Sequence, residues 1–207
     1  MAVIRRLPRY YRYLSDLLKL DIKRISSKEL SNRMGITASQ IRQDLNCFGG
    51  FGQQGYGYNV EMLFNEIGKI LGIHNEYKTI IIGAGNMGQA LANYSNFKKR
   101  GFDLIAIFDV DEDIIGKSIG GIEVMHLDGM DEYIKINKID IVMLCVPYDQ
   151  TAPLAERVAD IGIKGIWNFS PMDLELKQDV IIENVHLSDS LMVLGYRINQ
   201  QTNCTKG

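Results

Sequence analysis

The spacing of apolar residues changes part-way along the chain. Up to about residue 71 they recur every three or four positions, as on one face of an amphipathic helix. This spacing predicts helices over about 8–24, 27–34, 37–47 and 60–71. Beyond residue 78 the apolar residues form short continuous runs, which indicate strands buried on both faces of a parallel sheet. The pattern therefore predicts a helical N-terminal part followed by an α/β domain.

The second part alternates between strands and helices. We expect strands at about 80–82, 104–108, 122–125, 139–146, 165–169 and 180–187. Helices are expected in the segment QALAN and over about 130–136 and 150–161. Ser188 is a candidate N-cap for a last helix over about 189–199. Such alternation is typical of a doubly wound, Rossmann-type parallel sheet.

Two capping motifs predict a helix-turn-helix near the N-terminus. Ser26 and Glu29 stand in the arrangement S-x-x-E, in which each side chain satisfies a free backbone N–H at a helix start. Gly35 suits the left-handed conformation that ends such a helix. Thr37 and Gln40 then repeat the capping arrangement at the start of the next helix. Two capped helices joined by so short a turn are typical of a helix-turn-helix that binds DNA.

The helix that follows Thr37 would expose a polar face opposite a buried stripe of Ile41, Leu45 and Phe48. Polar side chains on that face could hydrogen-bond base edges or phosphates, although any small three-helix domain has a polar outer face. The next residues, GGFGQQGYGY at 49–58, predict a β-hairpin, because flexible linkers seldom carry aromatic residues. A hairpin directly after a recognition helix is the wing of a winged helix. The predicted DNA contacts are Ser39, Gln40, Arg42, Gln43 and Asn46 on the helix and Phe51, Gln53, Gln54, Tyr56 and Tyr58 on the hairpin.

A glycine-rich turn follows the first buried run of the α/β part. Gly83, Gly85 and Gly88 have the spacing G-x-G-x-x-G. In a dinucleotide site these glycines would permit the turn, the approach of a pyrophosphate, and close packing of the helix on the strand. Asp109, at the end of the next strand, would accept hydrogen bonds from ribose hydroxyls, and together with Asp111 would repel the 2′-phosphate of NADP(H). The arrangement predicts an NAD(H) site; a turn that is merely glycine-rich is the alternative.

Charge is divided unevenly between the two parts. Residues 1–58 carry ten Lys or Arg against four Asp or Glu, whereas the whole 207-residue chain has a net charge of −2. We therefore expect a basic domain with a polyanionic partner and an acidic domain without one. No run reaches the length of a membrane span, and the first residues lack the pattern of a signal peptide. Three widely spaced cysteines, in no metal-binding pattern, fit a reducing cytoplasm.

Little of the chain is left for catalysis. The predicted sheet and its helices account for nearly all residues between 78 and 187, so no substrate domain of a dehydrogenase remains. Tyr94 and Lys98 match the spacing of a catalytic Tyr/Lys pair, but on the helix directly after the glycine turn, where such reductases do not place it. We predict no catalytic residue and no metal site. An NAD-dependent oxidoreductase and an NAD-binding interaction module with weak DNA binding are the alternatives to a DNA-binding sensor.

Taken together, the motifs resemble those of the Rex family, the redox-sensing transcriptional repressors of bacteria. The resemblance spans nearly the whole chain and rests on TASQIRQDLNCFGGFGQQGYGY, IIGAGNMGQALANY, IAIFDVD, CVP, GIWNFSP and VHLSDSL. It implies an N-terminal winged helix with a linker helix (1–77), a Rossmann NAD(H)-binding domain (78–187), and a C-terminal helix and tail exchanged between the subunits of a homodimer (188–207). It also implies that NAD⁺ and NADH compete for one pocket, and that NADH releases the repressor from a palindromic, double-stranded operator DNA.

The resemblance further implies roles for individual residues. The pyrophosphate loop would be Gly83, Ala84, Gly85, Asn86, Met87 and Gly88, with Asp109 as the ribose acceptor. The segments nearer the nicotinamide would be Val146, Pro147, Asn168, Phe169, Ser170 and Pro171, and Tyr94 matches a tyrosine associated with sensing the reduced ring. The chain departs from the family at Gln43, Gln53 and Gln54, where basic residues are usual. We expect this departure to weaken phosphate attraction and to flatten the salt dependence of DNA binding.

Overall fold

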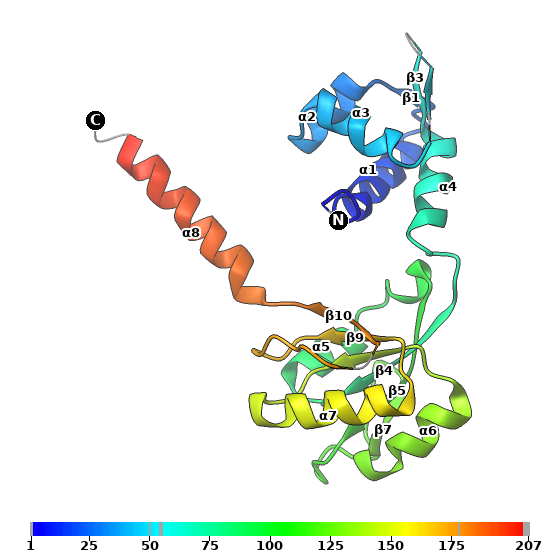
Figure 1. The fold of residues 1–207 in the computed structure, drawn as a ribbon, viewed down its shortest axis with the longest axis vertical. Helices are drawn as coiled ribbons and strands as arrows, with labels where there is room; N and C mark the ends of the chain where they lie inside the picture. The colour runs from blue at the N-terminus through cyan, green and yellow to red at the C-terminus, as the bar shows by residue number, and fades with distance from the viewer. Residues whose placement is uncertain (1, 50, 54–55, 178, 205–207) are drawn as a thin grey trace. The chain divides into compact units, whose positions relative to one another are not determined.

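The computed structural model describes residues 2–49, 51–53, 56–177 and 179–204, and the side chains at 52, 53 and 202–204 lie outside that description. The chain divides into two compact units, Met1–Asn75 and Glu76–Gly207. Figure 1 labels most of their helices and strands.

The N-terminal unit packs four helices beside a small antiparallel sheet. The helices are α1 (Leu7–Lys19), α2 (Ser27–Met34), α3 (Ala38–Asn46) and α4 (Val60–Ile70). The sheet has the order β1 (Arg24–Ile25), β3 (Gly57–Asn59), β2 (Gly52–Gln53), and β2 and β3 form the predicted hairpin. Fully buried Leu14, Leu30, Ile41, Leu45 and Ile67 bring the four helices together in one core.

Helix α1 ends five residues earlier than the apolar spacing predicts. Asp21 takes a left-handed conformation (φ 52°), which breaks the helix. Arg24 and Ile25 then pair with Asn59 and Tyr58 of β3 rather than continuing the helix. The long first helix was therefore a wrong prediction, because pairing with a distant strand outweighed local helical spacing.

Only one of the two predicted capping boxes is complete. At the start of α2, the Ser26 hydroxyl accepts from the Glu29 backbone N–H while the Glu29 carboxylate accepts from that of Ser26. At the start of α3, the Thr37 hydroxyl accepts from the backbone N–H of Gln40, at 3.2 Å. The Gln40 side chain does not return to Thr37, because its amide donates to Asp44 instead.

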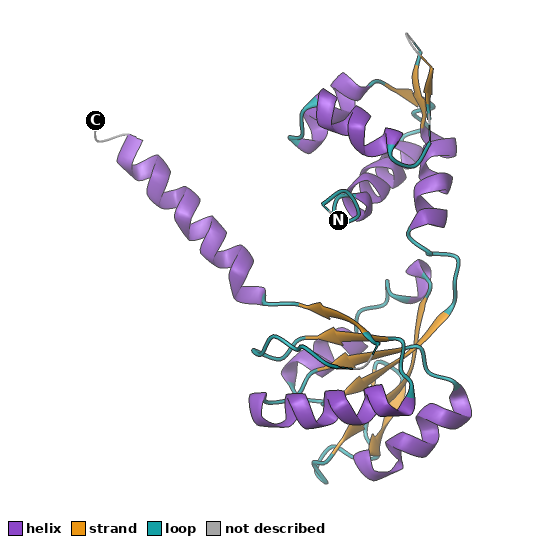
Figure 2. Cartoon of the chain, viewed as in Figure 1, coloured by secondary structure: helices purple, strands orange, loops and turns teal. Residues whose placement is uncertain are grey.

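The C-terminal unit is built on a twisted sheet with helices on both faces (Figures 1 and 2). Its described strands have the order β10-β9-β8-β4-β5-β7-β6, with every neighbouring pair parallel except β6 and β7. The antiparallel β6 was not predicted from the sequence. The strands are β4 (Tyr77–Ile82), β5 (Phe102–Asp109), β6 (Ser118–Ile119), β7 (Ile122–His126), β8 (Ile141–Leu144), β9 (Gly165–Asn168) and β10 (Ile181–Asn184).

Alternate side chains of β4 enter separate cores. Ile80 and Ile82 pack with α6 (Met130–Asn137) and α7 (Tyr148–Ile161) on one face. Ile81 packs on the other face with side chains of α5 (Asn86–Ala92). Its described residues also form two short 3₁₀ helices, η1 (Lys98–Arg100) and η2 (Leu127–Gly129). Burial of the central strand on both faces confirms the predicted Rossmann-type arrangement.

The last helix, α8 (Leu187–Cys204), is longer than predicted. It begins one residue before Ser188, so Ser188 lies within its first turn and the predicted N-cap at that position was wrong. Between residues 187 and 198 its large apolar side chains are exposed: Leu187, Leu191, Met192, Val193, Leu194, Tyr196 and Ile198. Within the described residues, no helix combines the length and apolar character needed to cross a membrane.

Candidate nucleotide site and DNA-binding surface

A cavity of about 620 Å³ lies at the carboxyl ends of β4 and β8. These strands are neighbours in the sheet, and the chain leaves them in opposite directions, which is where open α/β sheets bind ligands. Of the predicted cofactor residues, the cavity is lined by Gly83, Ala84, Gly85, Met87, Asp109, Val146, Pro147 and Phe169. Asn86, Gly88, Tyr94, Asn168, Ser170 and Pro171 are not among its lining residues.

The three glycines of the turn have different surroundings. Gly83 has a left-handed φ of 96° and would place a Cβ against the carbonyl oxygen of Cys145. A Cβ on Gly88 would overlap the carbonyl oxygen of Gly83, so α5 can approach the turn only because this residue has no side chain. Gly85 has open space around it, on the cavity side of the turn. The geometry therefore matches the separate roles expected of a dinucleotide turn.

Asp109 is held in place by three backbone N–H groups. Its Oδ2 accepts from the amide of Ala84 at 2.5 Å, and its Oδ1 accepts from the amides of Val110 at 2.7 Å and Asp111 at 3.0 Å. These bonds fix the carboxylate at the cavity wall. Because the Ala84 N–H is directed at Asp109, Ala84 links the turn to β5 instead of offering that N–H to a ligand.

Asn168 and Ser170 belong to a buried polar network beside the cavity. Asn168 is fully buried, and its Nδ2 donates to the Met172 carbonyl oxygen at 2.6 Å and to Oδ1 of Asn184 at 2.8 Å. The Ser170 hydroxyl lies 2.5 Å from that of Thr151, which also donates to the Pro147 carbonyl oxygen. These side chains hold the cavity wall and the end of β10 in place.

Tyr94 lies outside the cavity and after the end of α5, so it does not lie on that helix with Lys98 as expected. It is 46% exposed, and its ring meets the edge of Phe97 with centroids 4.8 Å apart. Phe97 contacts Trp167, and Trp167 contacts Phe169 of the cavity wall. A chain of aromatic rings thus connects Tyr94 to the cavity, while Lys98 forms an ion pair with Asp103.

Several cavity residues were not among those predicted. Burial raises the pKa of the Cys145 thiol to about 12. The side chain of Gln89 reaches back to donate to the Ala84 carbonyl oxygen at 2.8 Å. Some of these residues directly adjoin the predicted segments, whereas Ile114, Leu127, Gln150 and Leu154 come from parts of the chain that no motif marks. They are Gln89, Val110, Ile114, Leu127, Cys145 and Gln150, together with Ile82 and Leu154. Asp111, which the sequence suggested would repel a 2′-phosphate, also lines the cavity. Within the described part of the chain, no cluster of three or more His, Cys, Asp or Glu residues could hold a metal ion.

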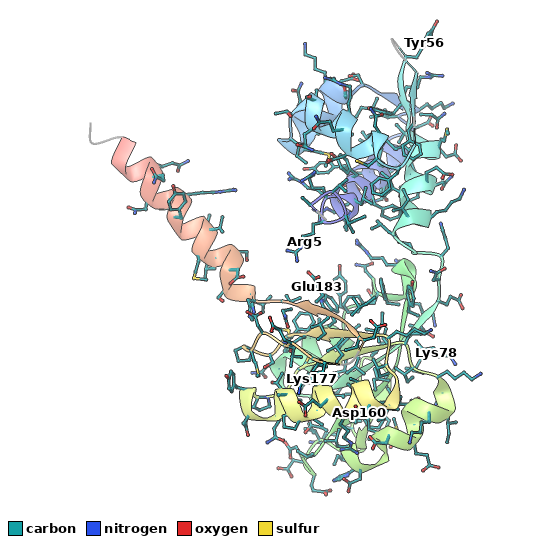
Figure 3. All side chains as sticks on the ribbon, in the orientation of Figure 1. Arg5, Tyr56, Lys78, Asp160, Lys177 and Glu183 are labelled. Carbon is teal, nitrogen blue, oxygen red and sulfur yellow. The ribbon has the colours of Figure 1, made fainter. Side chains whose placement is uncertain are left out.

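Of the predicted DNA contacts, some are exposed, others are partly or fully buried, and two have side chains outside the described part of the structure. Ser39, Arg42, Gln43 and Asn46 are exposed on α3, and Gln40 is partly exposed. Tyr56 is 70% exposed at the end of the hairpin (Figure 3), and its backbone carbonyl oxygen accepts from Arg24. Phe51 is partly buried, and Tyr58 is only 6% exposed in the core, so Tyr58 stabilises the hairpin rather than facing outward. Gln54 lies outside the described residues, as does the side chain of Gln53.

Comparison with known proteins decides between a sensor and an enzyme. A protein of Thermoanaerobacter sp. (strain X514) is 61% identical over 201 residues, covering 97% of this chain and 90% of the relative. A protein of Caldanaerobacter subterraneus subsp. tengcongensis is 62% identical over 201 residues, which again cover 97% of this chain and 90% of the relative. Both are named redox-sensing transcriptional repressor Rex. The chain belongs to the Rex family.

Domain families and solved Rex structures agree with this assignment. A family described as a putative DNA-binding protein N-terminus matches residues 1–46, and one described as a CoA binding domain matches residues 74–172. The Rex-family repressor RSP, solved with β-NAD⁺ and operator DNA, is 60% identical and has a TM-score of 0.91. The match covers 100% of this chain and 95% of the RSP chain. The structure of RSP with β-NADH has a TM-score of 0.92 at 57% identity, and the match covers 100% of this chain and 97% of the RSP chain. These likenesses confirm the predicted fold class and the prediction of a repressor rather than an oxidoreductase.

Proposed function

We propose that this Rex protein binds a palindromic operator as a homodimer in the cytoplasm, senses the NADH/NAD⁺ ratio, and leaves the DNA when NADH replaces NAD⁺. One observation carries the proposal. A winged helix and a dinucleotide cavity occur in one chain that is 60% identical, over its full length, to a repressor solved with β-NAD⁺ and operator DNA.

The nucleotide would lie across the cavity at the ends of β4 and β8. The turn at Gly83 and Gly85 would hold the pyrophosphate, and Asp109 would accept hydrogen bonds from the adenosine ribose. Val146, Pro147 and Phe169 would contact the nicotinamide half from the opposite wall. Tyr94 would respond to the ring through its aromatic neighbours. NAD(H) acts here as a ligand and is not turned over.

Helix α3 would read the operator in the major groove while the hairpin contacts the backbone. The exposed side chains on α3 and the excess of basic residues up to residue 58 support this role. Gln43 lacks the positive charge that usually strengthens phosphate contact, as do Gln53 and Gln54. We therefore expect a shallower dependence of operator affinity on salt than in a variant carrying basic residues at these positions.

The homodimer would be completed by exchange of α8. This helix exposes a row of large apolar side chains that a folded protein does not leave in water without a partner. A second, largely apolar cavity of about 400 Å³ lies on the sheet over β8, β9 and β10. Its lining includes Phe97, Phe102, Met143, Trp167 and Ile181. A second copy of the chain would cover both surfaces.

The two nucleotides control DNA binding only through their different affinities for the two arrangements of the dimer. A tenfold to hundredfold change in operator affinity needs about 1.4 to 2.7 kcal/mol of coupling free energy. The exchange of a charged nicotinamide ring for a neutral one would supply a difference of this size.

The decisive experiment selects bound duplexes from a random DNA pool and then titrates the best duplex with NADH in competition with NAD⁺. We expect NADH to lower operator affinity and NAD⁺ to restore it. Operator affinity that does not respond to NADH would show that the sensor function is wrong. Absence of DNA binding at low salt, with the dimer intact, would instead favour an interaction module.

A further inference from the structure

The side-chain amide of Gln40 is held by a buried carboxylate on its own helix. Its Nε2 donates to Oδ1 of Asp44 at 2.8 Å, one turn further along α3. Asp44 is 2% exposed and accepts three more hydrogen bonds from α1 and the residue before it. Arg6 donates from Nε and Nη2, both at 2.6 Å, and the Tyr10 hydroxyl donates at 2.8 Å.

This environment keeps Asp44 ionised. Burial alone would raise the pKa of Asp44, but hydrogen bonds from Arg6, Gln40 and Tyr10 outweigh burial and hold that pKa below its ordinary value. An ionised carboxylate can only accept hydrogen bonds. The amide of Gln40 must therefore turn its nitrogen toward Asp44 and its carbonyl oxygen away from it.

The carbonyl oxygen of Gln40 is left without a hydrogen bond from any residue that the structure describes. Gln40 lies in the first turn of α3 and is partly exposed. In a helix-turn-helix, the N-terminal residues of the recognition helix are those that contact base edges. The fixed oxygen is thus a hydrogen-bond acceptor at a position suited to reading DNA.

We propose that Asp44 makes Gln40 an obligate acceptor for an exocyclic amino group in the major groove, either N6 of adenine or N4 of cytosine. Gln40 is then a specificity-determining contact, and Asp44, Arg6 and Tyr10 are positioning residues. Guanine and thymine present the acceptors O6 and O4 at that place, and two acceptors cannot form a hydrogen bond with each other. An amide free to turn over would tolerate either kind of base. The inference rests on the proposed binding of operator DNA.

The test compares base preferences of full-length variants selected on a random duplex pool without NADH. Wild type should enrich adenine or cytosine at one position of each half-site. Gln40→Ala should lose the preference at that position alone, and Asp44→Asn should widen it to guanine or thymine. Cys47→Ala, exposed at the end of the same helix and not among the predicted DNA contacts, should retain it. If wild type enriches no sequence, operator binding itself is wrong; if Gln40→Ala selects the wild-type sequence, the inference about Gln40 is wrong.

Base analogues test the contact with wild-type protein. Removing the exocyclic amino group at the selected position should weaken binding about tenfold, the order of one base-edge contact. The same analogue should have no effect on Gln40→Ala. Equal losses in both proteins would overturn the contact.

Hydrogen exchange tests the fixed amide without relying on the folding of Asp44→Asn. The side-chain N–H₂ of Gln40 should exchange more slowly in the free wild-type protein than that of exposed Gln43. Equal exchange rates for the two side chains would overturn the role of Asp44.

Discussion

The amide nitrogen of Ala84 lies 2.5 Å from Oδ2 of Asp109, so one hydrogen bond ties the glycine turn to the end of the neighbouring strand. The same carboxylate is the proposed acceptor for ribose hydroxyls. Asp109 would therefore both shape the cavity and bind the nucleotide.

Replacement of Asp109 by alanine should weaken NADH binding about tenfold or more. Hydrogen bonds to a charged group contribute about 1.5–3 kcal/mol each, and the turn also loses its link to β5. Titration calorimetry measures the change, with Asp113→Ala as a control from the same loop but outside the cavity lining. Unchanged affinity in Asp109→Ala would contradict the ribose role, as would tighter binding of NADPH than NADH by wild type.

Alanine at Gly85 and at Gly88 should affect different properties. The Gly88→Ala side chain would overlap the Gly83 carbonyl oxygen, and such overpacking typically costs about 1–3 kcal/mol of unfolding free energy. Gly85→Ala has open space and should keep its melting temperature but obstruct a pyrophosphate. Thermal melting and NADH titration of both variants separate the effects. Equal loss of melting temperature in both would show that the turn is not divided in this way.

Features that depend on residues close together in the sequence were predictable. The turns at Gly35 and Gly83, each with a left-handed φ, and the complete capping box of Ser26 and Glu29 are of this kind. The central strand was also predictable, because burial on both faces requires a continuous apolar run.

Features set by distant partners were not predictable. The local sequence predicts Gln40 as a capping residue, but its amide donates to Asp44 instead. The ionised form of Asp44 is in turn stabilised by Arg6, which is 38 residues away in sequence. Asn168 lies beside predicted pocket residues, yet its fully buried amide bonds to Asn184 of β10. Such partners come together only through the topology of the sheet and the helices.

Stability should depend on pH through His186, which precedes the exposed part of α8. Its hydrogen bond with Asp173 is the main cause that raises the pKa of His186 above the ordinary 6.5, and the charges of Asp173 and Asp189 add to it. A pKa raised on folding stabilises the protein below pH 6.5, and this contribution is lost as the pH rises through the folded-state pKa. The melting temperature of wild type, relative to Asp173→Asn, should therefore fall between mildly acidic and mildly alkaline pH. A constant difference between the two proteins would contradict the pairing.

The thiol of Cys145 should resist modification although it lines the nucleotide cavity. With a pKa of about 12, only roughly one molecule in ten thousand carries the reactive thiolate at pH 8. Exposed Cys47 should react with iodoacetamide in the folded protein, while Cys145 reacts only after unfolding. Peptide mass spectrometry measures both sites separately. Equal labelling of the two cysteines in the native protein would leave direct thiol oxidation as a competing route for the redox signal.

The ion pair between Arg6 and Asp44 changes what counts as the smallest DNA-reading fragment. Helices α2 and α3 make a helix-turn-helix by sequence, but the amide that we propose reads a base is oriented by a residue in front of α1. A peptide excised as α2 and α3 alone would keep Gln40 and lose its orientation. Shortening the chain past Arg6 would do the same, so a deletion far from the recognition helix in sequence would broaden the set of operators that the repressor accepts.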